Sequence, residues 1–150
     1  MNKILGANNW VFSVDDLRSD DPSLIEHNED FWSEKAHSGK WKVLNSKNGS
    51  EIASFQLLTM ANCCGICVST RANVNEAFRK MGLGTLLNEL RKDIAKNDGY
   101  GILFCTSRLD NEAQQKILTN NGWKKIFMFN NPRTKNNITL DIYDLSQHKI

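Results

Sequence analysis

The residues best suited to chemistry lie in one short stretch, in which two cations and two glycines precede a helical pattern. Arg79 and Lys80 are followed by Gly82 and Gly84, and apolar residues then recur every three or four positions from 83 to 94. Glycine lacks a Cβ, so the backbone there can adopt unusual dihedrals and let a ligand come close. The first turn of a helix presents N–H groups without partners, and the helix dipole favours anions at that end. The pattern therefore predicts a phosphate-binding loop.

Two common glycine loops do not fit this spacing. A nucleotide-triphosphate loop requires Gly, four residues and then Gly-Lys-Ser/Thr, whereas Gly84 is followed directly by Thr85. A dinucleotide-binding loop requires a third glycine three residues after the second, and this chain has Leu87 there. The phosphate group must therefore belong to another class of ligand.

The elements that would position this loop follow from the apolar pattern and the turn residues. Strands are predicted over 10–14, 41–44, 51–59, 64–74, 102–106, 123–129 and 138–145, with a hairpin turn at Asn48-Gly49. Helices are predicted from Pro22 to about Ser38, from Leu83 to Asp98 and from Asp110 or Asn111 to Asn121. Their core-facing residues should be Leu83, Leu86, Leu87, Leu90 and Ile94 in the second helix, and Ala113, Ile117 and Leu118 in the third. Strand and helix alternate between 64 and 129, which predicts an α/β fold with a partly parallel sheet.

Length and composition limit the class of protein. With 150 residues, of which 40% are hydrophobic and 24% are charged, the chain is expected to form one domain over 1–150 with a single core. No apolar run approaches the roughly 18 residues of a membrane span, and the first residues do not resemble a secretory signal. These features favour a cytoplasmic protein.

The loop and its surroundings resemble the GCN5-related N-acetyltransferase (GNAT) family. Arg79-x-x-Gly82-x-Gly84 after an extended strand is similar to the family's coenzyme A pyrophosphate loop. A second signature, Asn111 followed by Gly122-Trp123, is similar to the family's next helix and its end. The resemblance spans about Trp41 to Leu145. It implies a GNAT-like mixed central sheet, with splayed parallel strands and flanking helices.

This resemblance also implies a ligand and the residues that hold it. Acetyl-CoA would lie between the two splayed strands as the co-substrate, and no metal is expected. Backbone groups of Ala72 and Val74 would pair with the pantetheine, and Asn111 would face the pantetheine or the thioester. The pyrophosphate would lie over Arg79, Lys80, Met81, Gly82, Leu83, Gly84 and Thr85.

The chain departs from the family where catalytic side chains are common. Many members have a tyrosine four residues before the Gly-aromatic pair, to protonate the leaving thiolate, and here that position is Leu118. Others have a glutamate base near the position of Val68, which is not acidic. No catalytic residue is therefore assigned, and direct attack of an amine on the thioester remains the simplest chemistry. The candidates for a base that acts through water are Asp15, Asp16 and Glu51.

The cysteines, histidines and large aromatics have simpler interpretations than catalysis. Cys64 and Cys67 would lie on opposite faces of a strand, which disfavours a metal or redox pair, and Cys63 and Cys105 also fit free thiols. A nucleophilic Cys105 is disfavoured because no histidine lies in the neighbouring elements. His27, His37 and His148 should lie on the surface, and Phe31, Trp32 and Trp41 are expected to belong to the core rather than to a substrate cage.

Charge is distributed unevenly, which bears on the acceptor. Residues 15–34 carry a net charge of −7 and the other 130 residues carry +9. A small-molecule or protein amine, cationic before it loses its proton, would be attracted to the acidic segment, unless that segment is only a solvated helix. The same acids make nucleic acid an unlikely partner. A catalytically weak module that binds an acyl-CoA or a protein, and an enzyme that modifies nucleic acids, are the alternatives. A homodimer is compatible with the sequence, which does not specify the oligomeric state.

Overall fold

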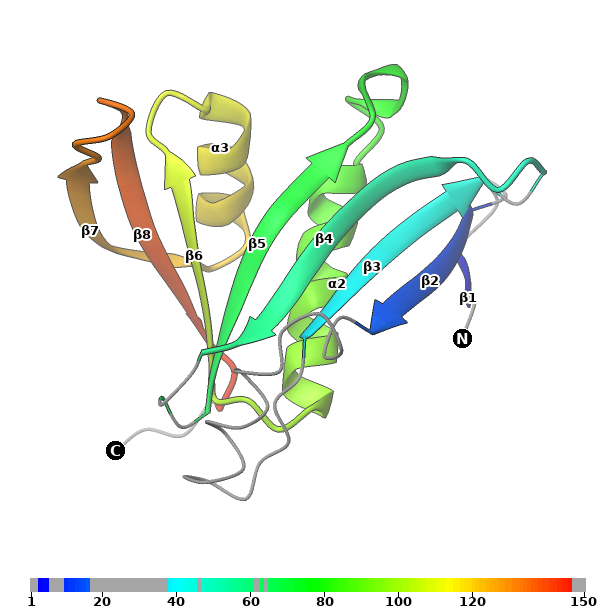
Figure 1. Ribbon diagram of the computed structural model, residues 1–150, viewed down its shortest axis with the longest axis horizontal. Helices are drawn as coiled ribbons and strands as arrows, with labels where there is room; N and C mark the ends of the chain where they lie inside the picture. Colours follow the sequence, from blue (N-terminus) through cyan, green and yellow to red (C-terminus); the bar gives the residue numbers. More distant parts are fainter. Residues whose placement is uncertain are drawn as a thin grey trace.

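One mixed β-sheet organises the part of the chain that the computed structural model describes, residues 3–5, 10–16, 38–45, 47–60, 63 and 65–146. Within these residues the strand order is β1-β2-β3-β4-β5-β6-β8-β7 (Figure 1). The strands are β1 (Lys3–Leu5), β2 (Trp10–Asp16), β3 (Ser38–Asn45), β4 (Glu51–Thr59), β5 (Ile66–Val74), β6 (Ile102–Arg108), β7 (Lys124–Asn130) and β8 (Asn137–Asp144). The helices are the short 3-10 helix η3 (Glu76–Phe78), α2 (Leu83–Asn97) and α3 (Glu112–Asn120). The predicted mixed sheet with flanking helices is confirmed.

The first half of the sheet is antiparallel. Strands β3 and β4 form the predicted hairpin, in which Gly49 takes a φ of +70° in the turn. Trp41 is buried, and its ring stacks on Phe55 with centroids 5.7 Å apart, so Trp41 is a core residue as predicted. Strand β2 extends two residues beyond the predicted range, and the short β1 beside it was not predicted.

The only parallel pair of the described sheet separates after a short contact. Strands β5 and β6 pair at Ile66 with Ile102, at Cys67 with Leu103 and at Val68 with Phe104, and then no further. Figure 1 shows the two strands spreading apart toward their carboxyl ends. The predicted splay is therefore confirmed, and residues 69–74 of β5 have no strand partner on that edge.

A bulge bends β5 within this free segment. The register with β4 shifts between Ser54 and Gln56, which pair with Asn73 and Thr70, so two residues of β5 face one of β4. Arg71 has a φ of +52° at this point. Such a bulge changes the direction of a strand and increases its twist. It therefore sets the direction in which Ala72 leads into the glycine loop.

Helix α2 ends as the sequence predicts. Gly99 takes a φ of +89°, its N–H donates to the Lys96 carbonyl, and the Tyr100 N–H donates to the Ala95 carbonyl. This is the Schellman arrangement, which satisfies carbonyls that the helix itself leaves without partners. A left-handed residue is required there, and glycine adopts that conformation at little cost.

The buried face of α2 contains the predicted stripe and extends beyond it. Leu83 and Leu87 are buried as expected, whereas Leu86, Leu90 and Ile94 are only partly buried. The remaining buried positions are Asn88, Arg91, Lys92 and Ala95. Leu86, Leu90 and Ile94 nevertheless pack against the core, so the predicted stripe does face it, and the burial of the polar Asn88, Arg91 and Lys92 beside it is what the sequence did not predict.

Helix α3 packs closely against the start of α2. Asn111 caps it by accepting a hydrogen bond from the Gln114 N–H at 3.2 Å, and Gly122 follows its end with a φ of +81°. Leu118 is buried and Ile117 is partly buried, but Ala113 is exposed, contrary to the prediction. A Cβ added to Gly84 would lie 2.5 Å from Cδ1 of Ile117, so the two helices meet where α2 lacks a side chain.

The last two strands pair as predicted, but in an order that local patterns do not reveal. Strand β8 lies between β6 and β7, which leaves β7 at the edge of the sheet. Every residue of β7 is exposed, including the large apolar side chains of Ile126, Phe127, Met128 and Phe129. The core of this half of the sheet therefore lies under β6 and β8.

Two cysteines belong to the core. Cys67 on β5 and Cys105 on β6 are buried free thiols, and Cys63 is partly buried. Burial is the main cause that raises the pKa of the Cys67 and Cys105 thiols from 9.0 to about 12. A neutral thiol is a poor nucleophile and a poor metal ligand. Among the described residues, no group of His, Cys, Asp and Glu has the arrangement of a metal site.

Several expectations concern residues outside the described part of the chain. These are the helix predicted after Pro22 and the side chains of His27, His37, His148, Phe31, Trp32 and Cys64. In the part that the structure does describe, none of the helices has the length and apolar character needed to cross a membrane.

The contact between Gly84 and Ile117 leads to a prediction about stability. Gly84→Ala should leave the free energy of unfolding nearly unchanged, because the gain of about 1 kcal/mol in helix propensity is offset by the displacement of the Ile117 side chain. Ile117→Val removes the Cδ1 atom, so Gly84→Ala should raise the free energy of unfolding by roughly 0.5–1 kcal/mol in that background. Urea unfolding of the wild type, both single variants and the double variant measures this coupling. Equal effects of Gly84→Ala in the two backgrounds would contradict the packing described.

The buried thiols lead to a prediction about pH. Cys67 and Cys105 should remain unalkylated by iodoacetamide at pH 8 in the native protein and react after unfolding, as read by peptide mass spectrometry. Because the unfolded chain loses these protons first, the two thiols should lower the free energy of unfolding as pH rises from about 9 to about 12. The decrease should be smaller in a Cys67→Ala/Cys105→Ala variant. Rapid native modification of either thiol would show that it is accessible.

Candidate functional site

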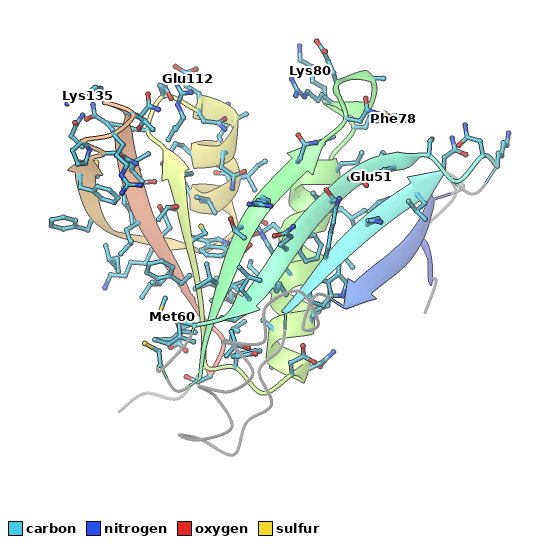
Figure 2. All side chains as sticks on the ribbon, in the orientation of Figure 1. Glu51, Met60, Phe78, Lys80, Glu112 and Lys135 are labelled. Carbon is cyan, nitrogen blue, oxygen red and sulfur yellow. The ribbon has the colours of Figure 1, made fainter. Side chains whose placement is uncertain are left out.

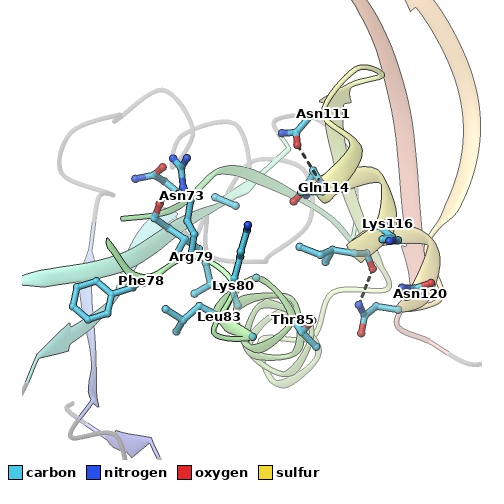
Figure 3. A pocket seen from close by; sticks show the side chains of 18 of the residues that line it. Asn73, Phe78, Arg79, Lys80, Leu83, Thr85, Asn111, Gln114, Lys116 and Asn120 are labelled. Carbon is cyan, nitrogen blue, oxygen red and sulfur yellow. Dashed lines mark hydrogen bonds between the residues drawn. The ribbon is translucent and has the colours of Figure 1, made fainter. Parts of the chain in front are cut away.

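A cavity of about 650 Å³ lies between the carboxyl end of β5, the glycine loop, α2 and α3 (Figure 3). Figure 2 shows Lys80 and Glu112 at the wide end of this opening and Met60 at the narrow end of the sheet. The lining residues are Ala72, Asn73, Val74, Phe78, Arg79, Lys80, Gly82, Leu83, Gly84, Thr85, Leu87, Arg91, Asn111, Ala113, Gln114, Lys116, Ile117, Asn120 and Asn121. The cavity is thus lined by the end of β5, by the loop that follows it and by the two helices.

The cavity contains most of the residues predicted to bind the cofactor. Ala72, Val74, Arg79, Lys80, Gly82, Leu83, Gly84, Thr85 and Asn111 all line it. Met81 does not, and its side chain is exposed. Two elements far apart in the sequence, the loop before α2 and the start of α3, therefore face the same space.

The glycine loop presents free backbone donors to this cavity. The turn begins at Asn75, whose side chain accepts a hydrogen bond from the Ala77 N–H, and continues through Lys80 and Gly82, with φ values of +63° and +80°. The first backbone hydrogen bond of α2 runs from the Leu86 N–H to the Gly82 carbonyl. The N–H groups of residues 83–85 donate to no other described group, so they are available to an anion.

Cations surround these donors from two sides. Arg79 and Lys80 belong to the loop, and Lys116 belongs to α3 on the opposite side of the cavity (Figure 3). Arg79 is held near the strand end by a hydrogen bond of 3.3 Å from its Nε to the Val74 carbonyl. Of the described lining residues, none is acidic. The mouth of the cavity is therefore built for a negatively charged ligand.

Lys116 was not predicted from the sequence. It lies on the helix that the second signature identifies, but only the packing of α3 against α2 places it beside the loop. A lysine in an amphipathic helix is usually a solvated surface residue. The close approach of Gly84 on α2 to Ile117 on α3 places the neighbouring Lys116 beside the loop.

The inner end of the cavity contains an unexpected charge. Arg91, two turns into α2, lines the cavity yet is only 2% exposed. Its Nη1 donates to Ser69 Oγ at 3.1 Å, its Nη2 donates to Asn88 Oδ1 at 3.5 Å, and its Nε has no hydrogen-bond partner. The guanidinium also lies 5.3 Å from the centre of the Trp123 ring. Burial lowers the pKa of Arg91, but an arginine remains charged.

The two positions where many relatives have a catalytic side chain are Leu118 and Val68 in this chain. Leu118 is buried under α3 and does not line the cavity, and Val68 is the last residue of β5 that pairs with β6. Glu51 is exposed and forms an ion pair with Lys40 at 3.4 Å, and it does not line the cavity. Asp15 and Asp16 belong to β2, which pairs with β3 and not with either splayed strand.

Sequence comparisons do not identify this chain. No model of a known family matches it, and no curated protein is similar enough in sequence to count as a match. The fold is therefore the property that can be compared.

Solved structures of acetyltransferases share this fold. The IAA acetyltransferase from Bacillus cereus superposes with a TM-score of 0.67 at 12% identity, over 89% of this chain and 99% of that one. The ribosomal-protein-S18-alanine N-acetyltransferase from Escherichia coli gives 0.63 at 15% identity, over 92% and 96%. A GNAT family acetyltransferase from Elizabethkingia anophelis, with acetyl-CoA bound, gives 0.65 at 15% identity, over 89% and 97%. The chain therefore has the fold of the GCN5-related N-acetyltransferase family.

Proposed function

We propose that this protein is an acyltransferase that moves an acetyl group from acetyl-CoA to a primary amine of a small molecule or a protein. The observation that carries the proposal is the cavity at the carboxyl end of β5, whose described lining residues include no acid and whose mouth has free N–H groups and cations. A diphosphate attached to a long neutral arm matches this arrangement, because the charge stays at the mouth and the arm can enter the cavity. The fold shared with acetyltransferases favours the same ligand.

The loop would hold the pyrophosphate. The N–H groups of residues 83–85 would donate to its oxygens, and Arg79, Lys80 and Lys116 would add charge-assisted contacts from both sides. The dipole of α2 acts in the same direction. Met81, whose side chain is exposed, could contribute only through its backbone.

The pantetheine would run along the free edge of β5. Beyond Val68 this edge has no strand partner, so the backbone groups of Ala72 and Val74 can pair with the two amides of the pantetheine arm. Asn111 uses its side-chain oxygen to cap α3, which leaves its amide nitrogen to donate to the arm. The thioester would then lie farther inside, near the point where β5 and β6 separate.

The reaction needs no covalent intermediate on the protein. The amine nitrogen attacks the thioester carbonyl, a C–N bond forms, the C–S bond breaks, and the amine proton passes through water to the departing thiolate. Because the side chain of Leu118 is aliphatic, the proton would not come from that position. A backbone N–H of β5 would stabilise the oxyanion, and positioning would supply much of the acceleration.

The acceptor is proposed to be an amine that approaches as a cation. The acidic residues 15–34 would attract it, and it must lose a proton before it attacks. The rate should therefore increase with pH until the amine is deprotonated.

A second candidate function is a binding module that holds acyl-CoA without transferring the acyl group. The burial of Leu118, at the position where many relatives have a proton donor, is the observation that favours it. Tight binding of acetyl-CoA without release of free thiol for any member of a broad amine panel would favour this module.

Two substitutions in the loop test the proposed cofactor site. Arg79→Glu should weaken binding of CoA about tenfold or more, because it replaces an attractive charge by a repulsive one. Gly82→Trp should obstruct the cavity, because Gly82 lines it and a Cβ added there meets no protein atom within 4 Å. The positive φ of this residue adds a cost of about 1–3 kcal/mol to the folded state. Calorimetry measures CoA affinity, and release of free thiol measures transfer.

The matched control for Arg79→Glu is Arg133→Glu, which makes the same change at an exposed position away from the cavity. It should leave CoA affinity and thiol release unchanged. Wild-type affinity in both Arg79→Glu and Gly82→Trp would show that the loop does not hold the pyrophosphate.

A further inference from the structure

The buried guanidinium of Arg91 lacks a compensating anion. The groups that accept its hydrogen bonds, Ser69 Oγ and Asn88 Oδ1, are both neutral. Among the described residues, no carboxylate oxygen lies within 4.0 Å of its nitrogens, and the described ion pairs involve other residues. Of the five N–H donors of a guanidinium, these contacts use two, and Nε has no partner at all. A buried charge left in this state is costly, which favours an anionic ligand beside it.

The surroundings of Arg91 hold it in place without neutralising it. Asn88 Oδ1 also accepts a hydrogen bond from Trp123 Nε1 at 2.6 Å, and the Trp123 ring lies beside the guanidinium. Asp141 on β8 is buried and its Oδ1 has no partner, yet it forms no ion pair with Arg91. Arg91 is therefore held by neutral side chains, while its charge remains unpaired.

Arg91 lies at the inner end of the same cavity whose mouth holds the glycine loop. Gly84 and Arg91 both line it and are seven residues apart on α2, which corresponds to about 10 Å along the helix axis. Ser69, the residue that Arg91 contacts, directly follows the last β5 residue paired with β6. A carrier bound by its pyrophosphate at the loop would thus direct its acyl end toward Arg91.

We propose that Arg91 binds the free carboxylate of a dicarboxylic acyl group, so that the preferred donors are malonyl-, succinyl- or glutaryl-CoA. This inference rests on the proposed acyl-CoA site and defines the class of its acyl group. A carboxylate supplies the negative charge that Arg91 lacks and can accept two parallel N–H bonds. A neutral thioester oxygen or an acetyl methyl group would leave the charge uncompensated.

The transfer chemistry is the same with such a donor. The amine nitrogen forms a C–N bond to the thioester carbonyl, the C–S bond breaks, and CoA leaves as the thiol after taking up the amine proton through water. The distal carboxylate takes no part in bond making and remains bound to Arg91. The product is an amide that carries a free carboxylate in place of the original amine.

Calorimetry with pairs of thioesters tests this inference. Malonyl-CoA should bind about tenfold or more tightly than propionyl-CoA, and succinyl-CoA should exceed butyryl-CoA by a similar factor, since each pair has the same number of acyl carbons. Arg91→Met should abolish both preferences and leave the affinities for CoA and butyryl-CoA within about threefold of the wild type. Arg91→Lys keeps the positive charge but loses the paired N–H donors of the guanidinium, so it should retain part of each preference.

Folding of the variants is checked by thermal unfolding, and Arg133→Met serves as the control for loss of an arginine elsewhere. Replacing an uncompensated buried charge by Met should not lower the midpoint greatly. If Arg91→Met does not fold, the wild-type comparison of charged and neutral thioesters still decides.

Equal affinities within each wild-type pair, with CoA itself bound, would overturn this inference and leave the proposed acyl-CoA site intact. The same holds if Arg91→Met weakens CoA and succinyl-CoA equally, because Arg91 would then hold the carrier. Failure of CoA and all of its thioesters to bind would overturn both the inference and the proposed function.

Discussion

The separation of β5 from β6 is the constraint on which the site depends. Backbone groups that lose their strand partner must find another, and Ala72 and Val74, at the end of the free edge of β5, line a cavity instead. The bulge at Arg71 and the turn through Gly82 then lead the chain from this free edge directly into α2. The free edge of β5 and the first turn of α2 both have backbone groups without a partner among the described residues. They lie close together because a short loop connects them in the chain.

Three buried positions of α2 are occupied by polar side chains, although buried helix positions are usually apolar. Asn88, Arg91 and Lys92 are buried, and each is held by a neighbour from another element, through Trp123, Ser69 and the Asn121 carbonyl. Lys92 also lies 4.1 Å from the centre of the Tyr143 ring. Such a network links α2 to β5 and to the end of α3, and thereby joins the two sides of the cavity.

Local signals explain what the sequence predicted well. The Asn48-Gly49 turn, the capping residue Asn111 and the terminal glycines at 99 and 122 each act within a few residues, and all of them were confirmed. The splay of β5 and β6 was expected only through the resemblance, because it depends on pairing between distant segments.

The features that the sequence did not predict also depend on contacts between distant segments. The burial of Arg91 and the position of Lys116 could not be predicted, since charged residues in helices usually face water and only tertiary packing places these two at the cavity. The contact between Gly84 and Ile117 shows how strict that packing is. This contact limits how closely the glycine loop with Lys80 and the helix α3 with Lys116 can approach each other. The width of the cavity therefore depends on the combined volume of the side chains at positions 84 and 117. In related sequences, a larger residue at one of these positions should accompany a smaller one at the other.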